Sequence, residues 1–167
     1  MVKLEVLNQI LFSSDFERFK EALEQYNIHE QDRYGNNILH YYIKESKKLK
    51  LDYKDMIDVI LSKGLDINER QSKGTFKRSP LHLAVAMNLE SIADYLIDLG
   101  ADVNSTDANG NSVLLAAVLR YRGQNGYIVE KLIKSGADIN KKNNHGISAF
   151  SLAQSIDSDV LKFFKQL

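Results

Sequence analysis

The side chains of this chain best suited to acid–base or metal chemistry near neutral pH are its four histidines, His29, His40, His82 and His145. His29 and His145 fall in predicted turns, and neither has a carboxylate or a second histidine at ligand spacing. A zinc site needs three or four such ligands that converge on one point. We therefore expect no metal site at the histidines. His40 and His82 instead occupy the same position of a phrase that recurs along the chain.

Paired aspartate and asparagine side chains suggest a second kind of chemistry, calcium binding. The phrase Gly-x-Asp-x-Asn occurs three times, with its aspartates at Asp66, Asp102 and Asp138. A calcium loop of this type needs a bidentate glutamate at its twelfth position. Counted from the three aspartates, that position holds Lys77, Val113 and Ala149. We therefore exclude calcium.

No other arrangement in the sequence matches a reactive site. The chain has no cysteine, which excludes disulfides, thiolate metal ligands and cysteine nucleophiles. It also lacks a phosphate-binding glycine loop, a G-x-S-x-G elbow and an H-E-x-x-H pair. We expect no catalytic residue and no cofactor. The alternative is a small enzyme with an unrecognised site, which a ligand-sized pocket lined by titratable groups of shifted pKa would support.

Length and composition favour one globular domain. The chain has 167 residues, 22 basic and 22 acidic, and this balance argues against a general polyanion binder. No apolar run approaches the roughly 20 residues needed to cross a bilayer, and the first residues do not form the apolar stretch of a signal peptide. We expect a cytoplasmic protein that binds no membrane.

The repeated phrases indicate how the chain is organised. The glycines of the Gly-x-Asp-x-Asn phrase, Gly64, Gly100 and Gly136, are spaced 36 residues apart. A second phrase, fullest at residues 79–84 (Ser-Pro-Leu-His-Leu-Ala), has weaker copies at 37–42, 112–117 and 148–153. Its anchor positions are separated by 42, 33 and 36 residues, so a basic unit of 33 with insertions fits all of them. Periods in this range are typical of a solenoid.

Local chemistry explains the two phrases. Apolar residues before each glycine recur at i, i+3 and i+4, which is helical spacing, and a glycine just past a helix adopts the left-handed conformation at little cost. Ser79, Ser112 and Ser148 are plausible N-caps of the helices that follow, and Pro80 suits a first helical turn. The phrases therefore end one helix, form a finger-like loop and start the next helix.

These phrases, at a basic period of 33 residues, make the chain resemble the ankyrin repeat. The resemblance implies an all-α fold, an ankyrin-type helical repeat solenoid with four recognisable repeats plus a degenerate N-terminal capping repeat. It implies one domain over 1–167, divided at about 1–31 (N-terminal cap), 32–70, 71–106, 107–142 and 143–167 (C-terminal capping repeat). It also implies a hydrogen-bonded structural role for His40 and His82. Leu115 and Ser151 depart from the pattern, because they replace that histidine.

The two ends of the solenoid need polar covers, and the sequence predicts which helices supply them. At the start of the chain we expect helices at about 4–11 and 16–26, and at its end a helix at about 158–167. This last helix places Val160, Leu161, Phe164 and Leu167 on one side.

Insertions and charge single out one part of the chain. Six extra residues lie within 44–54, three lie near 121–127, and the loop at 69–79 is three residues longer than its counterparts. Residues 44–78 hold ten basic and six acidic residues. Phe76, among lysines and an arginine, is either a docking anchor or a residue folded back onto the next repeat. For Lys44, Lys47, Lys48, Lys50 and Lys54 we favour a solvated loop over a contact with an acidic partner.

The resemblance implies a non-enzymatic protein-binding module that uses its concave face and finger loops. The expected partner is another protein, and the basic residues favour an acidic surface on it. One role considered for the module is an inhibitor or immunity protein that occludes a bacterial toxin or effector. A nucleic-acid binder that uses the basic finger 70–78 is a further alternative, weakened by the zero net charge. The positions that the resemblance implies for partner contact are Arg33, Tyr34, Asn36, Lys44, Glu45, Arg70, Lys73, Phe76, Lys77, Arg78, Ala86, Met87, Thr106, Ala108, Asn109, Asn111, Leu119, Arg120, Lys142, Asn144 and His145.

Overall fold

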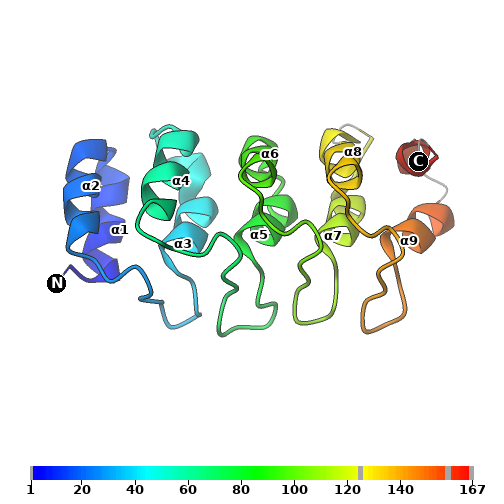
Figure 1. Cartoon of the computed structure of the whole chain (residues 1–167), viewed down its shortest axis with the longest axis horizontal. Helices are drawn as coiled ribbons and strands as arrows, with labels where there is room; N and C mark the ends of the chain where they lie inside the picture. The colour runs from blue at the N-terminus through cyan, green and yellow to red at the C-terminus, as the bar shows by residue number, and fades with distance from the viewer. Residues whose placement is uncertain (1, 124–125, 157–158, 166–167) are drawn as a thin grey trace. The chain divides into compact units, whose positions relative to one another are not determined.

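A computed structural model describes residues 2–123, 126–156 and 159–165 of the chain (Figure 1). The residues form two compact units, Met1–Pro80 and Leu81–Leu167, here called unit 1 and unit 2. Within the described ranges the regular structure is helical, and β-pairing is limited to isolated bridges. The predicted all-α class is confirmed.

Unit 1 contains four α-helices and one short 3-10 turn. The helices are α1 (Leu4–Ser13), α2 (Phe16–Glu24), α3 (Ile38–Glu45) and α4 (Tyr53–Leu61), and the turn is η1 (Ser46–Lys48). Helices α1 and α2 pack together, as do α3 and α4, and α1 also contacts α3 (Figure 1). The predicted insertion at 44–54 therefore forms η1 and the turn that leads into α4.

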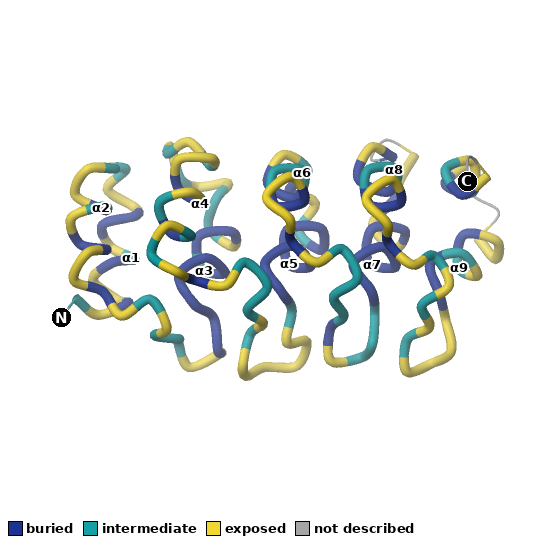
Figure 2. The backbone as a smooth tube through the Cα atoms, viewed as in Figure 1, coloured by how far each residue is buried: buried dark blue, intermediate teal, exposed yellow. Residues whose placement is uncertain are grey.

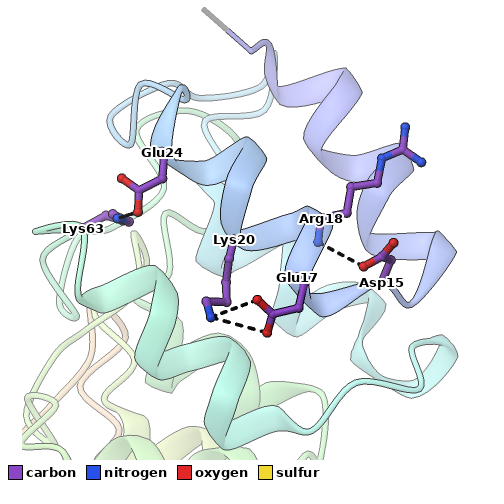
Figure 3. Close-up of polar contacts among 6 residues, drawn as sticks. All are labelled: Asp15, Glu17, Arg18, Lys20, Glu24 and Lys63. Carbon is purple, nitrogen blue, oxygen red and sulfur yellow. Dashed lines mark hydrogen bonds and ion pairs between the residues drawn. The ribbon is translucent and has the colours of Figure 1, made fainter.

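Short polar side chains start most helices of unit 1. The carboxylate of Asp15 accepts the N–H of Arg18 at the start of α2, and Asp52 accepts two N–H groups at the start of α4. Such caps satisfy donors that have no partner inside the helix. On the surface, Glu17 pairs with Lys20 along α2, and Glu24 at the end of α2 pairs with Lys63 after α4 (Figure 3).

The core of unit 1 is a layer of aliphatic and aromatic side chains between the paired helices. Helices α1, α2 and α4 each bury one stripe and expose the opposite one, whereas α3 is buried along most of its length (Figure 2). Among the fully buried side chains are Leu7, Phe19, Leu39, Tyr42 and Ile57. No helix pair is wide enough to cover its own apolar stripe, so stacked pairs share one continuous core.

Unit 2 continues the same scheme with five α-helices and a terminal 3-10 helix. They are α5 (Pro80–Ala86), α6 (Glu90–Asp98), α7 (Val113–Arg120), α8 (Gly126–Lys134), α9 (Ala149–Ser155) and η2 (Asp159–Phe164). Ser112 and Ser148 cap α7 and α9 through their side chains, as predicted, and Pro80 is the first residue of α5. Of the predicted insertion at 121–127, residues 124–125 lie outside the described residues.

The Gly-x-Asp-x-Asn phrase follows α4, α6 and α8, where it ends a helix pair and leads into the next finger. Gly64, Gly100 and Gly136 have φ values of 86°, 86° and 87°, the left-handed conformation predicted for them. In the phrase at 102–104, the Asp102 carboxylate accepts the N–H of Asn104 at 2.8 Å. The Asn104 side chain then accepts the N–H of Asp138 at 2.8 Å and donates to the carbonyl of Gly136 at 3.1 Å. In this copy the phrase therefore braces the backbone of two successive repeats.

The predicted terminal covers are partly correct. Helices α1 and α2 confirm the predicted N-terminal pair, although α2 ends at Glu24. At the other end the predicted helix is present over residues 159–164, where it is a 3-10 helix. This helix is fixed by the Tyr121 hydroxyl, which donates to Asp159 at 3.0 Å, and by an edge-to-face contact between Tyr121 and Phe163. Residues 158, 166 and 167 of the predicted helix lie outside the described residues.

In the part of the chain that the structure describes, no helix has the length and apolar character that a bilayer crossing requires.

Candidate functional site

Three of the four finger loops share one internal frame. The first finger (32–37), the third (105–112) and the fourth (141–148) each begin with a short polar side chain that bonds two N–H groups further along the loop. Asp32 accepts the N–H groups of Tyr34 and Asn36 at 2.8 and 2.9 Å, and Asp107 accepts those of Asn109 and Asn111 at 2.8 and 3.0 Å. These hydrogen bonds contribute to a lowered pKa at Asp32, which is partly buried and remains ionised.

The signal for this frame is a short motif, Asp-x-x-Gly-Asn, at residues 32–36 and 107–111. This motif was not recognised from the sequence. In both copies the final asparagine donates its side-chain amide back to the aspartate, at 2.7 Å for Asn36 and 3.0 Å for Asn111. The two central residues of the motif are left at the tip of the finger, where their side chains take no part in the frame.

Neighbouring fingers within each unit are joined by a second set of hydrogen bonds. In unit 1 the Gln71 amide donates to Asn36 Oδ1 at 2.6 Å, and in unit 2 Asn143 donates to Asn111 Oδ1 at 2.7 Å. Gly35 is part of the same contact, because a Cβ atom there would lie 2.3 Å from the backbone nitrogen of Lys73. The fingers of each unit therefore present their tips as one connected surface.

The second finger (69–79) is built differently from the others. Its two sides are joined by two hydrogen bonds between Gln71 and Arg78. The backbone N–H of Arg78 donates to the side-chain oxygen of Gln71 at 3.0 Å, and the backbone N–H of Gln71 donates to the carbonyl of Arg78, also at 3.0 Å. The Arg70 side chain donates to the Lys77 carbonyl at 2.8 Å. At the tip, Phe76 is 43% exposed, and the Arg78 guanidinium carbon lies 4.2 Å from the centre of its ring. Phe76 is therefore partly covered by its own finger and partly open to solvent.

The imidazole of His40 supports the base of this second finger. Its Nε2 atom lies 2.9 Å from the Arg78 carbonyl oxygen, and its Nδ1 atom lies 2.7 Å from Asn37 Oδ1. Burial disfavours the charged ring more than these oxygen atoms favour it, and the pKa of His40 falls from 6.5 to about 4. His40 is thus a neutral structural histidine at pH 7, in the role that the resemblance implied. His82 is also buried.

Most of the predicted contact residues reach the surface. Thirteen of them have exposed side chains, namely Arg33, Tyr34, Lys44, Arg70, Lys73, Phe76, Lys77, Ala108, Leu119, Arg120, Lys142, Asn144 and His145. Six more are half-buried, namely Glu45, Arg78, Met87, Thr106, Asn109 and Asn111.

Two predicted contact residues are wrong because their side chains are buried. Asn36 is 1% exposed and serves the finger frame and the hydrogen bond from Gln71. Ala86 is 7% exposed at the end of α5, a helix that is buried along 81–86, and its methyl group is too short to reach the surface. Neither side chain is available to a partner.

Electrostatics distinguish the paired finger tips of unit 1. Four exposed cations there, Arg33, Arg70, Lys73 and Lys77, have no carboxylate partner among the described residues. By contrast, Lys48 in the neighbouring insertion pairs with Glu45 at 2.7 Å. Unpaired like charges held on one surface attract a partner of opposite charge.

A cavity of about 500 Å³ lies next to these tips in unit 1. It is bordered by α1, the first finger and α3, and its lining includes Glu5, Asn8, Glu30, Tyr34 and Tyr41. The side-chain oxygen of Asn8 is buried without a hydrogen-bond donor. This cavity was not predicted from the sequence, because its walls come from three separate segments.

Unit 2 carries a smaller and more apolar feature. Leu119 is 50% exposed at the end of α7, beside Arg120. A cavity of only about 20 Å³ lies nearby, with Ala117, Arg120 and Ile128 in its lining. This volume is about one water molecule and far below a typical ligand pocket. Among the described residues of the whole chain, no group of three His, Asp or Glu side chains is placed to hold a metal ion.

Comparison with known proteins bears on the family of the chain. The model of the family described as ankyrin repeats (3 copies) matches residues 7–107 and 49–143. Comparison with curated proteins returned no match.

Proposed function

This chain belongs to the ankyrin-repeat family, and on that premise we propose that its finger tips and the exposed end of α7 bind one partner protein. Ankyrin repeats mark it as a protein–protein interaction module. The observation that supports this surface is that the side chains that hold each finger loop differ from the side chains exposed at its tip. Hydrogen bonds within the first and third fingers fix the loop backbone, so the tip residues are held in place before a partner arrives. Preorganisation of this kind lowers the entropy lost on binding.

We further propose that the partner presents an acidic surface to unit 1. The support is the group of four exposed, unpaired cations on the paired tips, with Tyr34 and Phe76 exposed among them. Arginine and aromatic side chains are enriched among the residues that dominate binding energy at interfaces. On unit 2, exposed Leu119 supplies apolar contact area.

Occlusion is the mechanism that we propose for the biological effect. A rigid module that covers the active site of an enzyme inhibits it without chemistry of its own, as an immunity protein does for a toxin. A scaffold, in contrast, leaves its partner active. An activity assay of the captured partner, with and without this chain in excess, distinguishes the two effects.

The binding surface is tested with the partner identified by affinity purification from the native cell and then made recombinantly. We expect Lys77→Glu and Phe76→Ala each to weaken its binding about fivefold or more, because both side chains lie exposed at the second finger tip. Lys47→Glu is the matched control, because Lys47 is equally an exposed lysine of unit 1 but lies on η1. Equal affinities for Lys77→Glu, Lys47→Glu and the unaltered chain contradict the proposed surface.

Arg78 is a less suitable test than its position suggests. Its side chain is half-buried over Phe76, and its backbone bonds both Gln71 and His40. Arg78→Glu is therefore expected to disturb the finger itself, so a loss of binding in that variant does not identify a contact.

A further inference from the structure

Unit 1 carries a cationic surface next to a cavity lined by carboxylates, and together they indicate the chemistry of a bound segment. One is the cationic tip surface, made of Arg33, Arg70, Lys73 and Lys77. The other is the 500 Å³ cavity between α1, the first finger and α3. Tyr34 belongs to both, because it is exposed at the first tip and also lines the cavity.

The tip surface is continuous across two fingers. Ser72 donates its backbone N–H to the Gly35 carbonyl at 3.3 Å, and the space beside Gly35 is filled by the backbone of Lys73. A Cβ atom at Gly74 would lie 3.6 Å from the carbonyl oxygen of Tyr34, so the second tip also touches the first. Charges from two fingers therefore act on one ligand segment.

The cavity, unlike the cationic tip surface, favours a positively charged ligand. Three carboxylates line it, from Glu5, Glu30 and Asp32. Those of Glu5 and Glu30 make no ion pair or hydrogen bond within the described residues, whereas Asp32 is occupied by its finger.

Two cations also line the cavity, and they do not reverse this preference. The guanidinium carbon of Arg33 lies 4.7 Å from the centre of the Tyr34 ring, which places that cation against the aromatic face. Lys3 precedes the first turn of α1 and, like Glu5, is exposed to solvent, so the three carboxylates of the lining still outnumber its two cations. The unsatisfied acceptors inside the cavity match a guest that brings hydrogen-bond donors and a positive charge, and Tyr34 and Tyr41 offer it aromatic walls.

We propose that unit 1 recognises a protein segment of mixed charge, in which acidic side chains lie on the paired finger tips and a lysine or arginine enters the cavity. This inference rests on the proposed protein-binding function and specifies the partner chemistry at that surface. A protein segment fits better than a nucleic acid, because a continuous polyanion that follows the tips also meets the carboxylates of the cavity.

A defined peptide tests the pattern without knowledge of the natural partner. The probe is a ten-residue synthetic peptide with four glutamates at one end and a lysine at the other, made in both chain orders. Two control peptides replace the lysine, or all the glutamates, by glutamine, and a ten-nucleotide oligothymidylate represents nucleic acid. Affinity is measured by NMR titration of the isotope-labelled full chain, which also reports which backbone amides shift.

The expected results form a double-mutant cycle. The K73E/K77E variant binds the probe about fivefold or more weakly than the unaltered chain does. Removing the glutamates from the probe lowers its affinity for the unaltered chain but not for that variant. Replacing the lysine of the probe weakens it threefold to fivefold on the unaltered chain and has no effect on Glu30→Gln. Glu5→Gln is a second cavity variant, and Lys47→Glu is the charge control.

Specific outcomes overturn the inference. It fails if the lysine and glutamine probes bind equally well to the unaltered chain, or if oligothymidylate binds as tightly as the peptide. If no peptide binds while the natural partner still loses affinity with Lys77→Glu, the charge pattern is wrong and the proposed function stands. If the natural partner is indifferent to Lys77→Glu as well, the proposed surface is wrong too.

Discussion

The buried imidazole of His40 makes the stability of the chain depend on pH in a predictable direction. The pKa of His40 is about 4 in the folded chain, against an ordinary value of 6.5. Between these values the unfolded chain binds a proton that the folded chain excludes. Stability from this group is therefore fully present above pH 6.5 and is lost as the pH falls toward 4.

The two pKa values set the size of the effect. At pH 7 the unfolded imidazole is mostly neutral, so proton binding favours unfolding by only a few tenths of a kcal/mol. At pH 5 the unfolded ring is almost fully protonated and the folded ring is still neutral. The difference in unfolding free energy between the two pH values is about 2 kcal/mol from His40 alone.

Urea unfolding followed by circular dichroism at pH 7 and pH 5 measures this difference. His40→Gln is less stable at both pH values, but about 2 kcal/mol of the pH dependence disappears, because glutamine does not titrate. His145→Gln, which removes an exposed histidine, is the matched control. An unaltered chain and His40→Gln that lose the same free energy between pH 7 and pH 5 would refute the reasoning.

Three further comparisons by urea unfolding test the loops and the contact that holds η2. Gly35→Ala and Gly136→Ala both place alanine at positive φ, at about 1–2 kcal/mol each, but only Gly35 also meets backbone at 2.3 Å and should be the more damaging; equal losses contradict the finger-to-finger contact. Asn104→Ala should cost about 1–3 kcal/mol through its two lost inter-repeat bonds, and Asn140→Ala, which is exposed, should cost little; the reverse order contradicts the brace. Tyr121→Phe keeps the ring contact and should cost about 1 kcal/mol, while no change means that η2 does not need the hydroxyl.

Local sequence was sufficient to predict the helices and their ends. Gly64, Gly100 and Gly136 adopt the left-handed conformation because a β-carbon is disfavoured there, and Ser112 and Ser148 cap helices because their side chains reach an N–H three residues on. Each of these effects depends on fewer than five consecutive residues. The short phrases that repeat along the sequence are therefore sufficient to predict these effects.

Effects that join distant residues were not predictable in the same way. Asn36 reads as a surface residue of a turn, but a glutamine 35 residues later, Gln71, bonds its side chain and helps to bury it. The cavity beside the first finger depends on how α1 and α3 meet, which no single segment encodes. Ala86 likewise lies at the end of a helix that is buried along 81–86, and its neighbours in sequence do not reveal this.

The division of labour within the Asp-x-x-Gly-Asn fingers has a consequence for how such a chain diversifies. The aspartate and asparagine hold the loop, while the two central positions, Arg33 and Tyr34 or Ala108 and Asn109, are absent from every side-chain bond of that frame. Substitutions at those positions cost little stability, so new binding specificities arise from a few amino-acid changes while the fold is kept. A library randomised at these four sites should stay folded and still sample many different targets.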